Sequence, residues 1–193
     1  MNFLAHLHIA EHCSSSLLGN LLGDFVKGDP TKHYQDDIAQ GIMLHRFVDS
    51  YTDNHLIMKQ CKTLFDSDLK RFAPIAMDMF WDHCLAKHWS RFHHQSLTRF
   101  VDNAELTIKQ TSAPLPDRFV RMSTHMWQGR WLESYQEFDN IKFALERMSL
   151  RSMRMAPLAE CGEQLEMHYQ EFSGLFNQLY PEVLEKAKQQ TRK

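Results

Sequence analysis

Residues 74–92, with the sequence PIAMDMFWDHCLAKHWSRF, decide the fold class of this chain. Their apolar side chains recur at spacings of three and four residues, which is the period of an amphipathic α-helix. Pro74 suits the first turn of such a helix, because the N–H that proline lacks would have no intrahelical partner there. The stretch therefore predicts a helix that begins at Pro74 and ends near Phe92.

Serine and aspartate residues are placed to cap further helices. The three serines at 14–16 can cap a helix that carries the apolar residues of 17–28. Asp36 or Asp37 can cap the next helix, which should end near Asn54. Ser96 can cap another.

Proline residues mark the breaks between the later elements. Residues 112–116, SAPLP, form a clear break between helices. The segment 161–190 is helical in pattern, and a kink or split is expected near Pro181. No alternating strand bounded by hairpin turns occurs. We therefore expect an all-α, single-domain helical bundle over residues 1–193.

The composition is that of a soluble globular protein. Hydrophobic residues make up 43% and charged residues 24% of the chain, which excludes the disordered, collagen-like and membrane classes. No run approaches the ~18 apolar residues of a membrane span, and the first residues lack the basic region of a signal peptide. Four scattered cysteines without a CxxC pair suit a reducing compartment. We expect a cytoplasmic protein that does not bind membranes.

Net charge and motif content argue against further classes. The 22 Lys and Arg against 24 Asp and Glu give a net charge of -2, so no overall basic field attracts nucleic acid. The chain contains no GxGxxG and no GxxxxGK[ST] motif, which removes most support for dinucleotide and P-loop binding. It also lacks a GxSxG elbow for acyl transfer. The sequence leaves the oligomeric state open.

Histidines are concentrated in the first half of the chain. Ten of the twelve lie within the first 94 residues, so any chemistry is expected there. Residues 8–12, HIAEH, match the H-x-x-E-H pattern of some zinc peptidases. The match covers five residues, no third ligand follows at a family spacing, and the serines at 14–16 end the helix at once. A zinc peptidase is therefore the weaker hypothesis.

Carboxylates lie beside apolar stripes on three of the expected helices. On a helical wheel Asp78 and Asp82 are neighbours within such a stripe, and Asp24 borders the apolar side of its own helix. His45 and Asp49 follow one another at i and i+4. A buried carboxylate is costly unless it is paired, so these groups indicate a cation, a buried Arg or Lys, or a shared proton. The three helices can converge on one cation.

A solvent-facing stripe would show the same pattern, and this alternative stays open for the Asp78/Asp82 pair and for the His45/Asp49 pair.

Arg46 lies near the line of His45 and Asp49, and its planar fork of donors can neutralise an anionic oxygen. Mixed His and Asp ligands favour Mn²⁺, Fe²⁺, Mg²⁺ or Zn²⁺. Such a site suits phosphoester hydrolysis, because the cation binds a phosphate oxygen and lowers the pKa of a bound water.

Five short motifs carry a resemblance to a known family. They are MNFLAHLH at 1–8, GNLLGDF at 19–25, HRFVD at 45–49, TDN at 52–54 and WDH at 81–83. Through them the chain resembles the acyl carrier protein phosphodiesterases over almost its whole length. The resemblance implies hydrolysis of holo acyl carrier protein to the apo form, release of 4'-phosphopantetheine, and a divalent cation, preferably manganese.

The resemblance also implies a fold and a set of site residues. The family is likened to the HD-type metal phosphohydrolases, in which His and Asp side chains from several helices hold the ion. Asp24, His45 and Arg46 are then the expected catalytic residues, with Arg46 as the phosphate clamp. The expected metal ligands are His6, Asp24, His45, Asp49, Asp78 and Asp82.

The implied substrate is a small and strongly acidic protein, so a basic surface near the site should steer it. The best candidates for this surface are Arg118, Arg121, Arg147, Arg151 and Arg154. Two alternatives remain. One is an HD-like metal phosphohydrolase acting on a nucleotide or another small phosphoester. The other is a non-catalytic helical binding module whose polar stripes are solvated.

Overall fold

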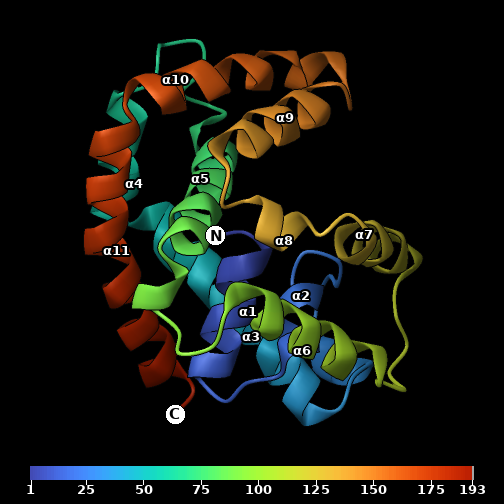
Figure 1. Ribbon diagram of the computed structural model, residues 1–193. Coiled ribbons are helices and arrows are strands. Elements are labelled where there is room, and N and C mark those ends of the chain that lie inside the picture. Colours follow the sequence, from blue (N-terminus) through green and yellow to red (C-terminus); the bar gives the residue numbers. More distant parts are fainter. Residues whose placement is uncertain (193) are drawn as a thin grey trace.

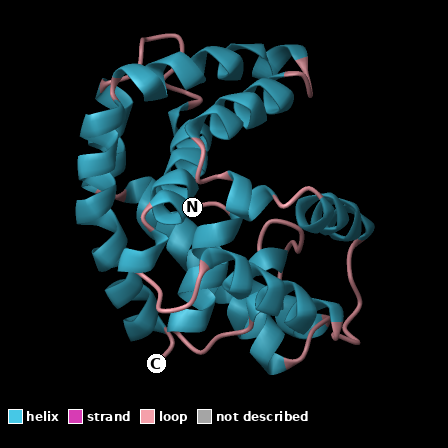
Figure 2. Ribbon diagram, in the orientation of Figure 1, coloured by secondary structure: helices cyan, strands magenta, loops and turns pink. Residues whose placement is uncertain are grey.

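The structure is a computed structural model that describes residues 1–192 and is helical along its length (Figures 1 and 2). Its α-helices are α1 (Phe3–His12), α2 (Leu17–Leu22), α3 (Asp36–Asn54), α4 (Leu56–Thr63), α5 (Ala73–Lys87), α6 (Leu97–Lys109), α7 (Asp117–Gln128), α8 (Trp131–Ser134), α9 (Phe138–Ser149), α10 (Cys161–Met167) and α11 (Tyr169–Gln190). Three 3-10 helices are η1 (Pro30–Lys32), η2 (Trp89–Arg91) and η3 (Met153–Glu160). Within residues 1–192 no strand occurs, so the predicted all-α class is confirmed. The helices share one hydrophobic core.

Two helix starts have the expected serine caps. Ser16 caps α2 by accepting the backbone N–H of Gly19 at 3.1 Å, and Ser96 caps α6 by accepting that of Arg99 at 3.3 Å. Pro74 lies in the first turn of α5. The local sequence therefore determines where these three helices begin.

The helix that follows Ser16 is shorter than predicted. It ends at Leu22, whereas the sequence predicts that it continues to about residue 28. The guanidinium of Arg46 donates to the carbonyls of Val26 and Gly28 at 2.6 and 2.7 Å. Since a side chain of α3 takes these carbonyls, the segment does not need its own helical hydrogen bonds. The helix after Pro74 also ends early, at Lys87, and η2 follows.

The predicted split near Pro181 is wrong, because α11 passes through this residue without interruption. The break lies at His168, between α10 and α11. Pro181 is exposed, so water can take the helix carbonyl that proline leaves without a donor. The neighbouring Tyr180 and Val183 are buried and hold the helix against the core.

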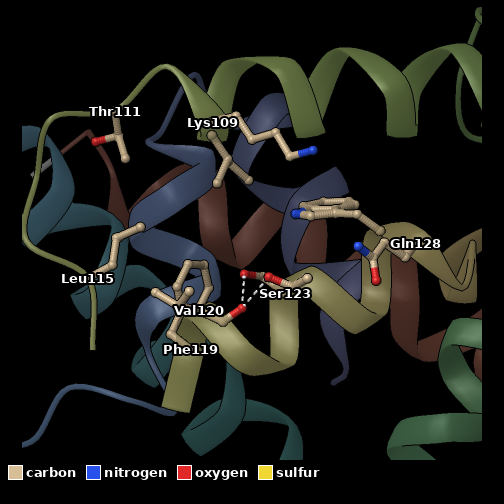
Figure 3. Close-up of a pocket in the computed structure, with 10 residues that line it drawn as sticks. Lys109, Thr111, Leu115, Phe119, Val120, Ser123 and Gln128 are labelled. Atoms are coloured by element: carbon tan, nitrogen blue, oxygen red, sulfur yellow. Dashed lines mark hydrogen bonds between the residues drawn. The ribbon is translucent and has the colours of Figure 1, made fainter. Parts of the chain in front are cut away.

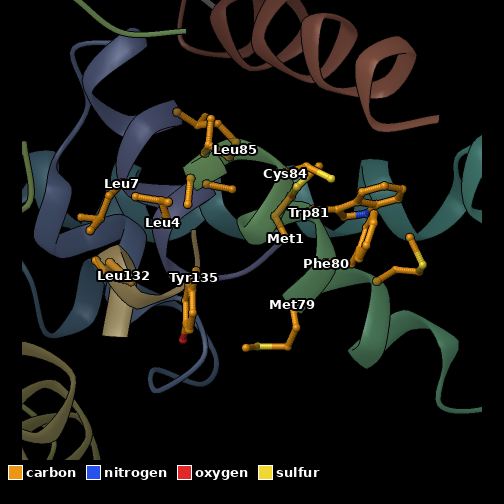
Figure 4. Close-up of a cluster of buried hydrophobic side chains, with 14 of the residues drawn as sticks. Met1, Leu4, Leu7, Met79, Phe80, Trp81, Cys84, Leu85, Leu132 and Tyr135 are labelled. Atoms are coloured by element: carbon orange, nitrogen blue, oxygen red, sulfur yellow. The ribbon is translucent and has the colours of Figure 1, made fainter. Parts of the chain in front are cut away.

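Helix α5 lies at the centre of the molecule and is packed by α1, α4, α9, α10 and α11 (Figure 1). Most of its side chains are buried, so it has no wide solvent-facing stripe. Figure 4 shows buried side chains of this core, with Leu4 and Leu7 of α1 on one side of the view and Phe80 and Trp81 of α5 on the other. In the described part of the chain, no helix combines the length and apolar character that crossing a membrane requires.

Two glycines allow α2 and α3 to touch backbone to backbone. A Cβ atom on Gly19 would lie 2.4 Å from the carbonyl oxygen of Ile38 and 2.9 Å from the Cα of Gly41. A Cβ on Gly41 would meet the carbonyl oxygen of Ser16 at 3.0 Å. These are backbone atoms, so no side-chain rotation relieves the clash. The contact therefore requires glycine at both positions.

We expect Gly41→Ala to destabilise the protein by about 1–3 kcal/mol, because overpacking of the α2–α3 contact outweighs the gain in helix propensity. Gly174→Ala is the matched control, since this glycine lies in α11 and its added Cβ would have nothing within 4 Å. The control should gain about 0.5–1 kcal/mol. Denaturant unfolding measures both values. A Gly41→Ala protein as stable as the control would contradict the close contact.

Candidate metal centre

His6 of α1 and His45 and Asp49 of α3 form a cluster of possible metal ligands. One ligand atom from each lies within 4.8 Å of the others. The Asp49 carboxylate bridges the two imidazoles, with Oδ1 at 3.0 Å from Nε2 of His6 and Oδ2 at 3.0 Å from Nε2 of His45. The two imidazole rings stack with their centroids 3.8 Å apart. Two histidines and one carboxylate thus face a single point.

Helix geometry and a glycine together place the ring of His45. His45 and Asp49 share a face of α3 because they are four residues apart. Gly23 follows α2, and a Cβ there would lie 2.1 Å from Cδ2 of the His45 ring. The carbonyl of Asn20 accepts a hydrogen bond from Nδ1 of His45 at 2.7 Å. Residues 20–23 therefore orient this imidazole.

The tautomer of His45 follows from that hydrogen bond. A carbonyl only accepts, so Nδ1 carries the proton and Nε2 points toward the carboxylates. Nε2 is buried, makes no hydrogen bond of good geometry, and lies 3.5 Å from Oδ1 of Asp24. A histidine that donates one ring N–H to a backbone carbonyl and keeps the other nitrogen for the ion is the usual arrangement of a metal ligand. The donor set therefore fits a divalent cation.

The charges of the cluster are strongly coupled. Burial alone would lower the pKa of His45, but the carboxylates of Asp24 and Asp49 outweigh it and raise the pKa to about 9. Burial would raise the pKa of Asp49, yet His45, His6 and the Met1 ammonium hold it well below its usual range. Burial, followed by the charge of His45, lowers the pKa of His6 to about 4. Asp49 is therefore ionised, and His45 carries a second proton on Nε2 that a bound cation would displace.

Asp24 lies at the open side of the cluster. Its side chain is 59% exposed, whereas that of His45 is 3% exposed. The neighbouring His45 lowers the pKa of the Asp24 carboxyl. Asp24 is thus an ionised group that solvent can reach.

Asp78 is paired with a cation other than a metal. The N-terminal ammonium of Met1 donates to its Oδ1 at 2.6 Å and lies 3.5 Å from Oδ1 of Asp49. Burial alone would lower the pKa of this ammonium, but the charges of Asp78 and Asp49 raise it to about 11. The predicted need for a cation beside Asp78 is therefore met within the chain.

Asp82, which the sequence predicts as a metal ligand, hydrogen-bonds to the start of α1. Its two oxygens accept the backbone N–H groups of Leu4 and Ala5 at 2.8 and 3.0 Å. These groups belong to the first turn of α1, where N–H groups lack intrahelical partners. Burial raises the pKa of Asp82 to about 7. Asp82 caps α1 and thereby fixes the helix that carries His6.

The remaining predicted site residues are arginines. Arg46 points to the 26–28 segment, as described above. The arginines predicted for partner binding are all exposed, and they occupy two separate segments. Arg118 and Arg121 lie on α7, while Arg147, Arg151 and Arg154 follow one another from α9 into η3.

The zinc-peptidase pattern at residues 8–12 does not form a site. His8 contacts the hydroxyl of Tyr180 at 2.7 Å, and Glu11 pairs with His93 at 2.5 Å. Sequence reasoning missed the orienting groups Gly23 and the Asn20 carbonyl. Both lie in GNLLGDF, which carried part of the family resemblance but contains only one ionisable residue.

Comparison with known proteins first gives the class. Residues 1–183 match the model of a phosphodiesterase family, and its description is acyl carrier protein phosphodiesterase. A protein of that name from Pectobacterium atrosepticum is 43% identical over 191 residues, which cover 98% of this chain and 99% of the relative. Another from Yersinia pestis is 42% identical over 188 residues, covering 97% of each chain. No solved structure matches the chain.

The chain therefore belongs to the acyl carrier protein phosphodiesterase family, as its motifs predicted. A further relative of the same name, from Enterobacter sp. strain 638, is 41% identical over 189 residues and covers 97% of this chain and 98% of its own. Since the matches span nearly the full length of each protein, the family assignment applies to the whole chain and not to a fragment of it.

We expect Asp82→Asn to lower the free energy of unfolding by about 1–3 kcal/mol. An amide offers one oxygen in place of two, so the N–H of Leu4 or Ala5 is left buried and unpaired. Asp53→Asn is the matched control, because Asp53 is exposed at the end of α3, and it should change stability by less than about 0.5 kcal/mol.

Denaturation with a chelator present measures this effect without any contribution from bound metal. Equal stability of the Asp82→Asn and Asp53→Asn proteins under these conditions would show that Asp82 is not a structural cap.

Proposed function

We propose that this protein removes 4'-phosphopantetheine from holo acyl carrier protein by hydrolysing the phosphodiester to the carrier serine, which leaves the apo form. Family membership supports a phosphodiesterase, and the name of its relatives supports the carrier protein as substrate. The observation that carries the chemistry is the cluster of His6, His45 and Asp49. These three residues are possible metal ligands. They lie in the N-terminal half of the chain, where the concentration of histidines predicts the chemistry.

We propose that His6, His45 and Asp49 hold a divalent cation and that Asp24 adds a ligand or accepts a proton from water. Manganese is the proposed ion, and Mg²⁺, Fe²⁺ and Zn²⁺ suit the same mixture of nitrogen and oxygen donors. When bound, such an ion polarises a phosphate oxygen and lowers the pKa of water. His45 keeps its Nδ1 proton on the Asn20 carbonyl throughout, so its other nitrogen stays directed at the centre.

Arg46 remains the proposed phosphate clamp. A guanidinium has five N–H donors, and the bonds to Val26 and Gly28 use two of them. Because these bonds anchor the segment that follows Asp24, Arg46 can position Asp24 and still present donors to an anionic oxygen. Asp78 and Asp82 are left out of the proposed ligand set, since each already has a strong partner within the chain.

We further propose that residues 1–193 form one metal-dependent phosphodiesterase domain of the HD-like kind. Its support is the placement of His and Asp ligands on two helices of an all-helical fold. An enzyme that acts on acyl carrier protein is expected in the cytoplasm. The exposed arginines of α7 and of the α9–η3 segment are its proposed contact surface for the acidic carrier.

The deciding experiment follows the intact mass of holo acyl carrier protein during incubation with the enzyme and Mn²⁺. We expect loss of the phosphopantetheine mass, no loss after treatment with a chelator, and recovery when Mn²⁺ is restored. Removing a group that only supports a metal ligand slows a reaction by up to about 100-fold. His45→Ala and Asp49→Asn remove proposed ligands themselves, so each should slow the reaction by more than that. His94→Ala, an exposed histidine outside the cluster, should be unchanged.

Each other outcome contradicts a part of the proposal. Activity that survives complete removal of metal would overturn the metal centre. An inert carrier protein together with hydrolysis of nucleotides or small phosphoesters would favour the alternative substrate. If the purified protein holds no stoichiometric ion and Asp24→Ala behaves identically, the chain is a binding module.

Replacing Arg147, Arg151 and Arg154 together with Ala should raise KM for the carrier protein several-fold at low salt and weaken its salt dependence. The reason is that exposed charges steer an oppositely charged partner without contributing to the core. Lys59→Ala, Lys70→Ala and Lys186→Ala combined remove the same charge from other exposed positions. If both triple variants show equal KM values, the α9–η3 segment is not a docking surface.

A further inference from the structure

A pocket of about 270 Å³ lies between α6 and α7. Figure 3 shows Lys109 of α6 on one side, Phe119, Val120 and Ser123 of α7 on the other, and Leu115 of the linker at one end. Val120 is 42% exposed although its neighbour Phe119 is buried, so the pocket opens to solvent along α7. The proposed phosphodiester chemistry does not use any of these residues.

The lining combines an apolar wall with hydrogen-bonding groups. Phe119 and Trp127 supply aromatic faces, while Ser123, Thr124 and Gln128 supply hydroxyls and an amide. The hydroxyls of Ser123 and Thr124 donate to the carbonyl of Val120 at 3.2 and 2.8 Å. Their oxygens therefore remain acceptors for a ligand. Such a lining suits a flexible chain in which amide groups alternate with aliphatic groups.

A short series of contacts connects this pocket to the candidate metal centre. The ring of Phe119 packs edge to face on that of Phe25, with centroids 5.4 Å apart. Phe25 follows Asp24 directly, and the Asp24 carboxylate lies 3.5 Å from Nε2 of His45. A ligand whose phosphate lies beside Asp24 therefore has the pocket within reach of its remaining atoms.

Basic residues flank the opening of the pocket. Arg118 and Arg121 are exposed on the turns of α7 that also carry Val120. The guanidinium of Arg118 lies 5.4 Å from the centre of the Phe25 ring, and Phe25 directly follows Asp24. A rim of this charge favours a ligand that is attached to an acidic protein.

We propose that the α6–α7 pocket binds the pantetheine arm of the carrier protein while the phosphate of that arm lies at the metal centre. The inference rests on the proposed function, because it takes the substrate from there. The amide groups of the arm meet Ser123, Thr124 and Gln128, and its dimethyl and thioethyl parts pack on Phe119 and Trp127. The pocket thereby distinguishes holo carrier protein from apo carrier protein by binding.

The test compares binding of holo and apo carrier protein to metal-free enzyme, so that no turnover occurs. The wild-type protein should bind the holo form about tenfold more tightly than the apo form, and titration calorimetry measures the ratio. Val120→Trp and Thr124→Trp fill the pocket from exposed positions and should make the two affinities equal. His125→Trp, on an exposed face of α7 outside the pocket, should keep the wild-type ratio.

Equal binding of the two forms by the wild-type protein would overturn the proposal. A preference for the holo form that persists in both folded Trp variants would also overturn it. Thermal unfolding establishes that the variants are folded, and having two of them covers the failure of one. The mass assay on the same wild-type preparation, after Mn²⁺ is restored, reports the proposed function separately. An enzyme that strips the carrier yet shows no holo preference keeps its function and loses this pocket.

Discussion

The close approach of α2 and α3 at Gly19 and Gly41 is the contact on which the candidate metal centre depends. It brings the end of α2 against α3, so that the Asn20 carbonyl reaches Nδ1 of His45 and Gly23 leaves room for the imidazole ring. Side chains larger than hydrogen at these glycines would separate the helices by the size of a methyl group. Because a metal ligand must be held within about 0.5 Å of its working position, such a shift would disperse the donors.

Three kinds of hydrogen-bonding or charged partner make the gathering of carboxylates tolerable. Asp49 lies between two imidazoles, Asp78 accepts from the Met1 ammonium, and Asp82 accepts from the N–H groups at the start of α1. The last two interactions hold the beginning of the chain against α5. His6 directly follows Ala5 in α1, so Asp78 and Asp82 of α5 help to position it. Asp49 and Asp24, in contrast, lie beside His45.

The candidate centre, the 23–28 segment and the α6–α7 pocket are connected by packing contacts in that order. His6 and His45 are buried, Asp49 is partly exposed and Asp24 is open to solvent. The 23–28 segment, which Arg46 anchors, packs on α7 through Phe25 and Phe119. Beyond this contact lie the mixed pocket and the exposed arginines of α7. This order matches a substrate that presents a phosphodiester, a polar and aliphatic arm, and an acidic protein surface at once.

Local sequence determined the all-helical class, the caps at Ser16 and Ser96, the start of α5 and the family, because each depends on residues only a few positions apart. It also brought His45 and Asp49 to one face of a helix, since the i and i+4 spacing does so in any α-helix. Tertiary structure alone decided that α11 runs through Pro181 without interruption and that α2 ends early. It also decided that Asp49 lies in the candidate metal centre, whereas Asp82 caps α1. Burial, exposed faces and partners from distant helices determine these features, and a helical wheel contains none of that information.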